Sequence, residues 1–167
     1  FTYIAFTLTN VTGFTEAAVP WLLLVFGAGS FIGNILGGKA ADRALNGSLL
    51  AILAALAIVL VAFGLMAAIP VAVVVLMLLL GTVGFAAAPG LQLRIMNVAG
   101  DAPTLASGMN IAALNIGNAL GAWLGGIAIT TALGFTAPLW VGAVLAAAAL
   151  LVLLGAVAAQ KRANPSD

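Results

Sequence analysis

The chain contains long apolar stretches, and these limit what it can fold into. One of them runs without a charged or polar side chain from Leu49 to Met66. A helix needs about 20 apolar residues to cross a bilayer core, whereas a barrel strand has about 10 residues of alternating polarity. The stretches are long and do not alternate, so they predict membrane-spanning helices. Composition agrees, because 65% of the residues are hydrophobic and 5% are charged, against about 25% charged in a soluble domain.

The spacing of these stretches predicts a single membrane domain, residues 1–167, with five complete spans and part of a sixth. The partial span is residues 1–12, which are apolar but too short to cross the bilayer. We expect the complete spans at about residues 17–38, 48–68, 71–93, 104–130 and 137–159. Because the chain begins at Phe1 rather than at a methionine, we expect it to be part of a longer protein; a trimmed N-terminus is the alternative.

The lysine and arginine residues predict how the chain lies in the membrane. All of them fall at 39–47, at 94–103 or after residue 160, and these segments share one side if each span crosses once. The opposite side carries only Glu16. Basic residues mark the cytoplasmic side of a membrane. We therefore expect a multi-pass protein of a bacterial cytoplasmic (inner) membrane, with its C-terminus in the cytoplasm.

Two glycine-rich faces recur in the sequence, 88 residues apart. Glycines four residues apart share a helix face and let another backbone come close. The faces predict close helix packing, and their recurrence indicates two three-helix repeats of opposite orientation in the membrane. Coincidence among 20 glycines and generic packing within the bundle are the alternatives. The packing glycines are Gly29, Gly33 and Gly37 in the first face and Gly117, Gly121 and Gly125 in the second.

The residue types that the chain lacks exclude several functions. It has no cysteine and no histidine, which excludes thiol chemistry and argues against a zinc, haem or iron–sulfur site. Its net charge of +1 provides no surface for nucleic acid. With no intramembrane carboxylate either, no nucleophile–base pair is visible. We therefore expect that the protein is not an enzyme and that it binds no metal, cofactor or nucleic acid.

The segment after the first glycine face carries a family resemblance. Gly38-Lys-Ala-Ala-Asp42-Arg43 resembles the signature loop of the major facilitator superfamily, which lies between the second and third helices of each half. Residues 3–15 and 110–121 resemble the first and fifth helices of the C-terminal half in its drug and sugar efflux branch. The loop lacks the further glycine and two basic residues of the full signature, as is typical of the C-terminal half.

This resemblance implies an all-α integral membrane fold. The chain would be a six-helix half-bundle with its first helix truncated, made of two inverted three-helix repeats. It would act as half of a secondary active transporter that moves a small-molecule substrate by alternating access, in the direction of efflux. Its partners would be a missing N-terminal half and the lipid bilayer. A membrane scaffold or assembly subunit that packs through the glycine faces, without transport, is the alternative.

The resemblance also implies roles for the residues of the signature. Gly38, Asp42 and Arg43 would form a gating loop in which Asp42 docks on a helix start in the other half, where the helix dipole favours a negative charge. In the alternative, the basic residues act only as topology signals and Asp42 is their counter-ion.

Polar residues inside apolar spans are costly and point to function. Tyr3, Thr7 and Asn10 recur at helical spacing and can share a face. By resemblance, the first helix of each three-helix unit lines a central cavity, and the span 71–93 is the counterpart of residues 1–12. The resulting candidates for the substrate cavity are Tyr3, Thr7, Asn10, Met77, Gly81, Phe85 and Gln92.

Two further expectations concern polar groups in the spans. The amides of the glycine-rich spans are expected to bond neighbouring helices in preference to substrate; they are Asn34, Asn110, Asn115 and Asn118. No charged residue lies at mid-membrane depth. A carboxylate for proton coupling would therefore have to lie in the missing half, unless the protein is a facilitator.

Overall fold

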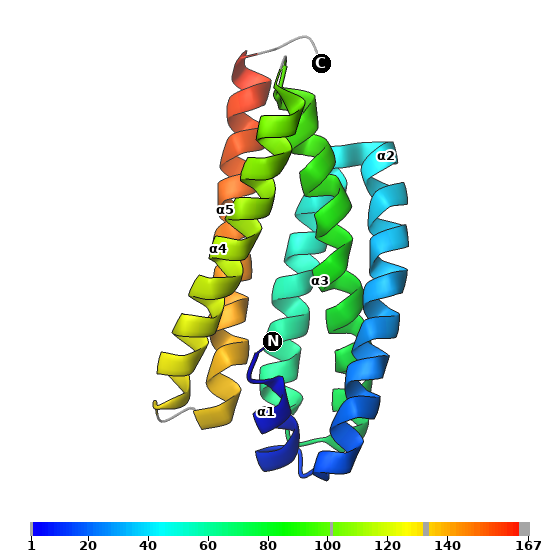
Figure 1. Cartoon of the computed structure of the whole chain (residues 1–167), viewed down its shortest axis with the longest axis vertical. Helices are drawn as coiled ribbons and strands as arrows, with labels where there is room; N and C mark the ends of the chain where they lie inside the picture. The colour runs from blue at the N-terminus through cyan, green and yellow to red at the C-terminus, as the bar shows by residue number, and fades with distance from the viewer. Residues whose placement is uncertain (1, 101, 132–133, 164–167) are drawn as a thin grey trace.

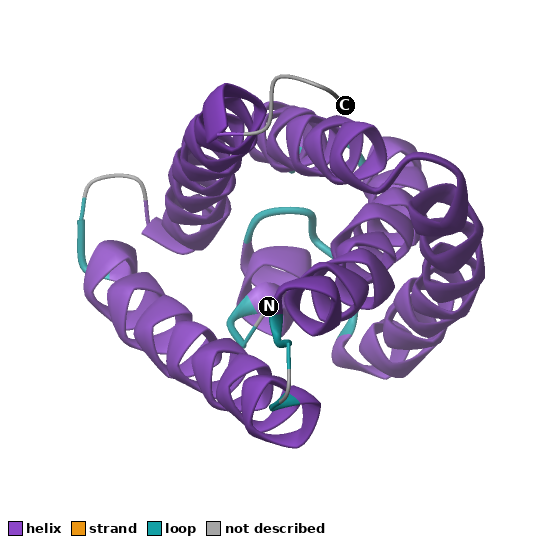
Figure 2. Ribbon diagram, turned by 90° about the horizontal axis from the view of Figure 1, so that it is seen from above, coloured by secondary structure: helices purple, strands orange, loops and turns teal. Residues whose placement is uncertain are grey.

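The structure, a computed structural model, describes residues 2–100, 102–131 and 134–163. All regular structure in this part of the chain is helical, as the sequence predicts. In chain order the helices are α1 (Ile4–Asn10), the 3-10 helix η1 (Glu16–Ala18), α2 (Val19–Met66), α3 (Pro70–Val98), α4 (Pro103–Ile129), the 3-10 helix η2 (Gly134–Thr136) and α5 (Ala137–Ala163). Seen along the bundle, the long helices are arranged around α1 (Figure 2).

Within the described ranges, four helical segments are long and apolar enough to cross a membrane. They are Glu16–Met66, Pro70–Val98, Pro103–Ile129 and Gly134–Gln160. The first has 51 residues, which would extend about 75 Å as one straight helix, more than twice the roughly 30 Å of a bilayer core. α2 instead folds back at Ala44, where the backbone is not helical (φ −155°, ψ 77°), and forms two antiparallel arms (Figure 1).

The two arms of α2 are residues 19–43 and 45–66. They lie where the spans 17–38 and 48–68 were expected, but the connection between them differs from the expected loop at 39–47. Alanine and leucine on both sides of the break favour helix. The helix therefore continues up to Ala44 and resumes directly after it, and the chain reverses at that one residue. The hydroxyl of Ser48 donates to the carbonyl oxygen of Ala40 across the break, at 2.7 Å.

The first glycine face (Gly29, Gly33 and Gly37) packs the first arm of α2 directly onto the backbone of α3. A Cβ atom at these glycines would fall 2.0–2.2 Å from three carbonyl oxygens of α3, those of Leu78, Thr82 and Ala86. These three residues of α3 are also four positions apart, so the two helices keep a matched register over two turns. Small residues permit this approach, which is a main source of helix association in lipid.

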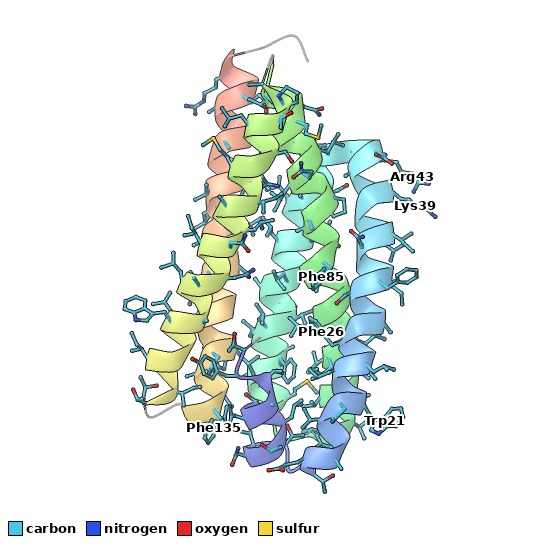
Figure 3. The ribbon with its side chains drawn as sticks, viewed as in Figure 1. Trp21, Phe26, Lys39, Arg43, Phe85 and Phe135 are labelled. Atoms are coloured by element: carbon cyan, nitrogen blue, oxygen red, sulfur yellow. The ribbon has the colours of Figure 1, made fainter. Side chains whose placement is uncertain are left out.

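Charge separates the two ends of the bundle. Lys39 and Arg43 lie at one end and Trp21 lies near the other (Figure 3). We call the first the basic end. A cluster of buried apolar residues near the opposite end joins α1, both arms of α2, α3 and α5; it consists of Ile4, Leu8, Leu22, Phe63, Val73, Leu76, Met77 and Leu139. A smaller cluster near the basic end consists of Leu49, Leu53 and Leu153.

α4 belongs to neither cluster. Of its residues, only Asn110 and Gly125 are buried, and residues 111–120 are all exposed. Among the described residues, nothing lies within 4 Å of a Cβ placed at Gly117 or Gly121, whereas one at Gly125 would lie 3.2 Å from the Tyr3 ring. α4 is therefore attached near its two ends and stands free between them, and most of the second glycine face has no partner within this chain.

Candidate functional site

A cavity of about 490 Å³ lies between the middle of α4 and the rest of the bundle. All five α-helices contribute to its lining. Much of the wall is aliphatic and comes from the second arm of α2 and from α5, with Leu53, Leu56, Leu60, Leu139 and Leu145. α4 contributes Asn118 to the lining.

An aromatic pair forms part of the wall. The ring of Phe26, from the first arm of α2, meets the ring of Phe85, from α3, edge to face with centroids 6.1 Å apart (Figure 3). Edge-to-face pairs of this kind are stabilising. Phe85 is 48% exposed and lines the cavity.

Three polar side chains line the cavity, and one of them is already engaged. Thr7 is buried, and its hydroxyl donates to the carbonyl oxygen of Phe135 at 2.6 Å. The hydroxyl oxygen of Tyr3 packs against Gly126, where a Cβ would lie 2.7 Å from it. Asn118 of α4 is exposed and forms no hydrogen bond with the described residues. A phenol and an amide are therefore the polar groups left for a ligand.

No charged residue is found among the described residues that line this cavity. An ion that left water for such a site would lose its hydration without gaining a counter-charge, which is strongly unfavourable. The site therefore suits an uncharged molecule with apolar or aromatic parts and a few hydrogen-bonding groups.

The structure separates the seven cavity candidates into two groups. Tyr3, Thr7 and Phe85 line the cavity. Met77 is fully buried in the apolar cluster instead. Gly81 packs against the backbone of α2, where its Cβ would lie 2.2 Å from the carbonyl oxygen of Phe26.

The two remaining candidates use their amides in contacts with the protein. Asn10 is exposed, and its Nδ2 donates to the carbonyl oxygen of Phe6 at 3.0 Å, within α1. Gln92 is hydrogen-bonded to two residues of α4, Ser107 and Asn110. Neither side chain lines the cavity.

Among the polar and aromatic residues that line the cavity, two were not among the candidates. Phe26 lies three residues before Gly29 and so shares the glycine face that packs on α3; its place on that face was the signal that could have found it. Asn118 was expected to bond a neighbouring helix, and it faces the cavity without a partner in the described part of the chain.

The residues of the signature segment lie at the basic end. Gly38 is half-buried, and its Cβ would touch Pro89 of α3 at 4.0 Å. Asp42 and Arg43 are exposed, on the last turn before the break in α2. Within the described residues they form no ion pair with one another, since adjacent residues of a helix do not face each other.

Comparisons with known proteins cover the whole chain. Residues 1–167 match the model of the Major Facilitator Superfamily. The chain is 41% identical over 153 residues to the inner membrane transport protein YdhP of Escherichia coli K12, covering 92% of this chain and 39% of that protein. It is 33% identical over 168 residues to a chloramphenicol resistance protein of Streptomyces lividans, covering 100% of this chain and 43% of that protein. No solved structure gives a significant match.

The chain thus spans about two fifths of the length of these relatives. That share is consistent with one half of such a transporter. The family that the signature segment indicates is confirmed by a match along the entire sequence. The chain belongs to the major facilitator superfamily.

Proposed function

We propose that the chain is the C-terminal half of a secondary transporter that exports a small uncharged solute by alternating access. The observation that carries this proposal is the cavity beside α4, which is lined by an aromatic pair and two available polar groups and by no charged residue in the described part of the chain. Its volume of about 490 Å³ falls within the usual range for small-molecule sites.

Solute chemistry follows from the same lining. The rings of Phe26 and Phe85 favour an aromatic or apolar moiety, and the amide of Asn118 favours a hydrogen-bonding group. Chloramphenicol, named for one relative, is an uncharged aromatic amide and fits this description. Export is the direction that resistance to such a compound requires.

The arrangement of the helices supports an inverted repeat. The first arm of α2 runs toward the basic end, and α4, which carries the second glycine face, runs away from it (Figure 1). Helices that correspond in inverted repeats run in opposite directions. With basic residues on the cytoplasmic side, the basic end and the C-terminal end of α5 would face the cytoplasm.

An N-terminal half is the partner that we propose for the free face of α4. Gly117 and Gly121 leave room for another backbone, as the first glycine face does for α3. Closing the cavity on this side requires a second wall, since the middle of α4 is exposed. The second half would also hold the helix start on which Asp42 docks, and any carboxylate used for proton coupling.

Ligand-dependent stability of the purified full-length transporter tests the proposal. Chloramphenicol should raise its unfolding temperature, whereas a charged compound of similar size should not, because the cavity offers no counter-charge. Replacing Phe85 with alanine should reduce the shift. Phe31→Ala is the matched control, because Phe31 is 69% exposed and does not line the cavity. A larger shift with charged compounds would contradict the proposed substrate class.

The scaffold alternative makes a different prediction. A scaffold that packs through glycine faces would show no ligand-dependent shift with any of these compounds. The first glycine face is already filled by α3, so only the second would remain for a partner. Because the first glycine face is used inside the chain, it is not available to a partner protein. This favours the transporter over the scaffold.

A further inference from the structure

α4 is attached near the basic end by three polar side chains, Gln92 of α3 with Ser107 and Asn110 of α4. The Nε2 atom of Gln92 donates to Ser107 Oγ at 2.7 Å, and Asn110 Nδ2 donates to Gln92 Oε1 at 2.6 Å. Ser107 and Asn110 are three residues apart and share a helix face. Both ends of the Gln92 amide are therefore used by one face of α4. We call these three residues the polar clasp.

The polar clasp is the principal attachment of α4 at this end. Neither apolar cluster includes a residue of α4, and Asn110 is its only buried residue before Gly125. In lipid the hydrophobic effect does not drive helices together, so interhelical hydrogen bonds and close packing have to hold them. Removal of the polar clasp would leave this part of α4 without comparable contacts.

The segment of α3 that carries Gln92 also contacts the reversal in α2. Arg94 donates from Nη1 to Asn46 Oδ1, two residues past the break at Ala44. Pro89, three residues before Gln92, lacks the N–H that would complete a backbone hydrogen bond and is the kind of residue at which helices bend. The C-terminal end of α3 therefore follows a proline that interrupts the backbone hydrogen bonding of the helix. Side chains of this end are hydrogen-bonded to both α2 and α4.

The polar clasp lies beyond the cavity on the side of the basic end. Gln92 is seven residues past the lining residue Phe85, about 10 Å along the helix. At its other end α4 is held differently, because Gly125 and Gly126 pack against the ring and hydroxyl of Tyr3 and Gly125 also lies against Pro138 of α5. One attachment is made of hydrogen bonds between neutral groups, and the other of close packing.

We propose that the polar clasp is a releasable strap that closes the cavity at the basic end. When its hydrogen bonds break, the first two turns of α4 move away from α3, while the contact with Tyr3 keeps the other end in place. Water that enters from the basic end can replace both hydrogen bonds at little net loss, so closed and open forms are close in free energy. Its role in solute access rests on the proposed transport function, but the movement itself can be measured without a solute.

Distances between spin labels in the full-length transporter, reconstituted in lipid nanodiscs, test the strap. The chain has no cysteine, so labels within it attach only at introduced positions, once any cysteines in the other half are replaced. One pair, Lys39→Cys with Leu105→Cys, spans the basic end. A second pair, Trp21→Cys with Trp123→Cys, spans the opposite end. The labelled residues are exposed in this chain.

We expect Gln92→Leu to increase the share of a longer population in the basic-end distances and to leave the opposite-end distances unchanged. Ser107→Ala, which removes one of two hydrogen bonds, should give a smaller share of that population. Ser107→Thr retains the hydroxyl and should match the unmodified clasp. Asn115→Leu is the matched control, because it removes an exposed amide from the same helix that has no hydrogen-bond partner among the described residues.

Two results would overturn the strap. Basic-end distances that are the same in Gln92→Leu and in the parent protein would show that the polar clasp does not hold α4. Equal lengthening at both ends would show a general loosening of α4 rather than release at one end. If the distances behave as expected but no compound changes the stability of the protein, the strap stands and the proposed transport function fails.

Discussion

The carbonyl oxygen of Thr82 occupies the space that a side chain at Gly33 would need, since a Cβ there would lie 2.0 Å from it. Neither group can move without separating two helices whose backbones are in contact over two turns. Glycine is therefore required at this position for packing rather than for backbone conformation.

Replacing Gly33 with alanine should destabilise the protein by about 1–3 kcal/mol, the usual range for an overpacked core. The measurement is the unfolding temperature of the detergent-solubilised full-length transporter. Gly27→Ala is the control, because Gly27 lies on the same arm of α2 with nothing within 4 Å of its Cβ position among the described residues. A similar loss of stability in both variants would show that the α2–α3 contact is not the cause.

Thr7→Val should lower the stability by about 1 kcal/mol, the net value of one hydrogen bond. The hydroxyl of Thr7 donates to the carbonyl oxygen of Phe135, 128 residues away, so its loss weakens the tie between α1 and η2. Thr9→Val is the control, because the Thr9 hydroxyl donates only within α1, to Ala5 and Phe6. Equal unfolding temperatures for the two variants would contradict this tie.

A larger side chain in place of Gly117 should lower the stability of the full-length transporter, even though no described residue of this chain lies within 4 Å of a Cβ there. In Gly117→Leu the side chain would meet the N-terminal half that we propose for this face, and the unfolding temperature should fall. Gly108→Leu is the control, because Gly108 is also open and lies on the opposite side of α4. An unchanged temperature for Gly117→Leu would mean that no helix packs there.

With chloramphenicol as the test solute of the transport function that we propose, Asn118→Ala should raise the KM for export by about threefold to tenfold, the effect of one lost hydrogen bond in a solute site. Asn115→Ala should leave it unchanged, because Asn115 does not line the cavity. The assay is accumulation of labelled chloramphenicol by cells that produce each variant at equal levels. Unchanged KM in Asn118→Ala would remove this amide from the site.

Asp42→Asn should reduce transport while leaving membrane insertion and stability intact. Asp42 is exposed and makes no ion pair with the described residues, so its loss does not disturb this half. The docking on the other half that we propose for Asp42, by contrast, would depend on the negative charge. The measurement pairs initial export rates with the amount of folded protein. Unchanged kinetics would leave Asp42 as a counter-ion only.

Much of the fold could be predicted from the sequence, because long apolar runs have few solutions in a membrane. The helical class and the placement of the spans follow from run length and charge. A reversal within 39–47 was expected, but its position at the single residue Ala44 could not be predicted, since no glycine or proline stands there and the break depends on contacts with α3 and on Ser48. Periodicity gives the faces of a helix but not which neighbour will cover them.

The site was less predictable than the fold, because the sequence does not say which neighbour covers each helix face. Tyr3, Thr7 and Phe85 were found because polarity and family resemblance indicated their helices. Met77 lies in the apolar cluster, although its helix lines the cavity, because the rotation of α3 is set by the glycine contact with α2. The use of Gln92 in the polar clasp depends on the approach of α4, which local sequence does not encode.

The amides of α4 also bear on how the protein is made. A span that carries Asn110, Asn115 and Asn118 is the least suited of the long helices to rest alone in hydrocarbon as it leaves the insertion machinery. Tyr3 and Gln92 precede it in the chain, whereas α5, which α4 also contacts, follows it. Two of the contacts that hold α4 are therefore already in the membrane when it is inserted, and the contact with α5 forms afterwards.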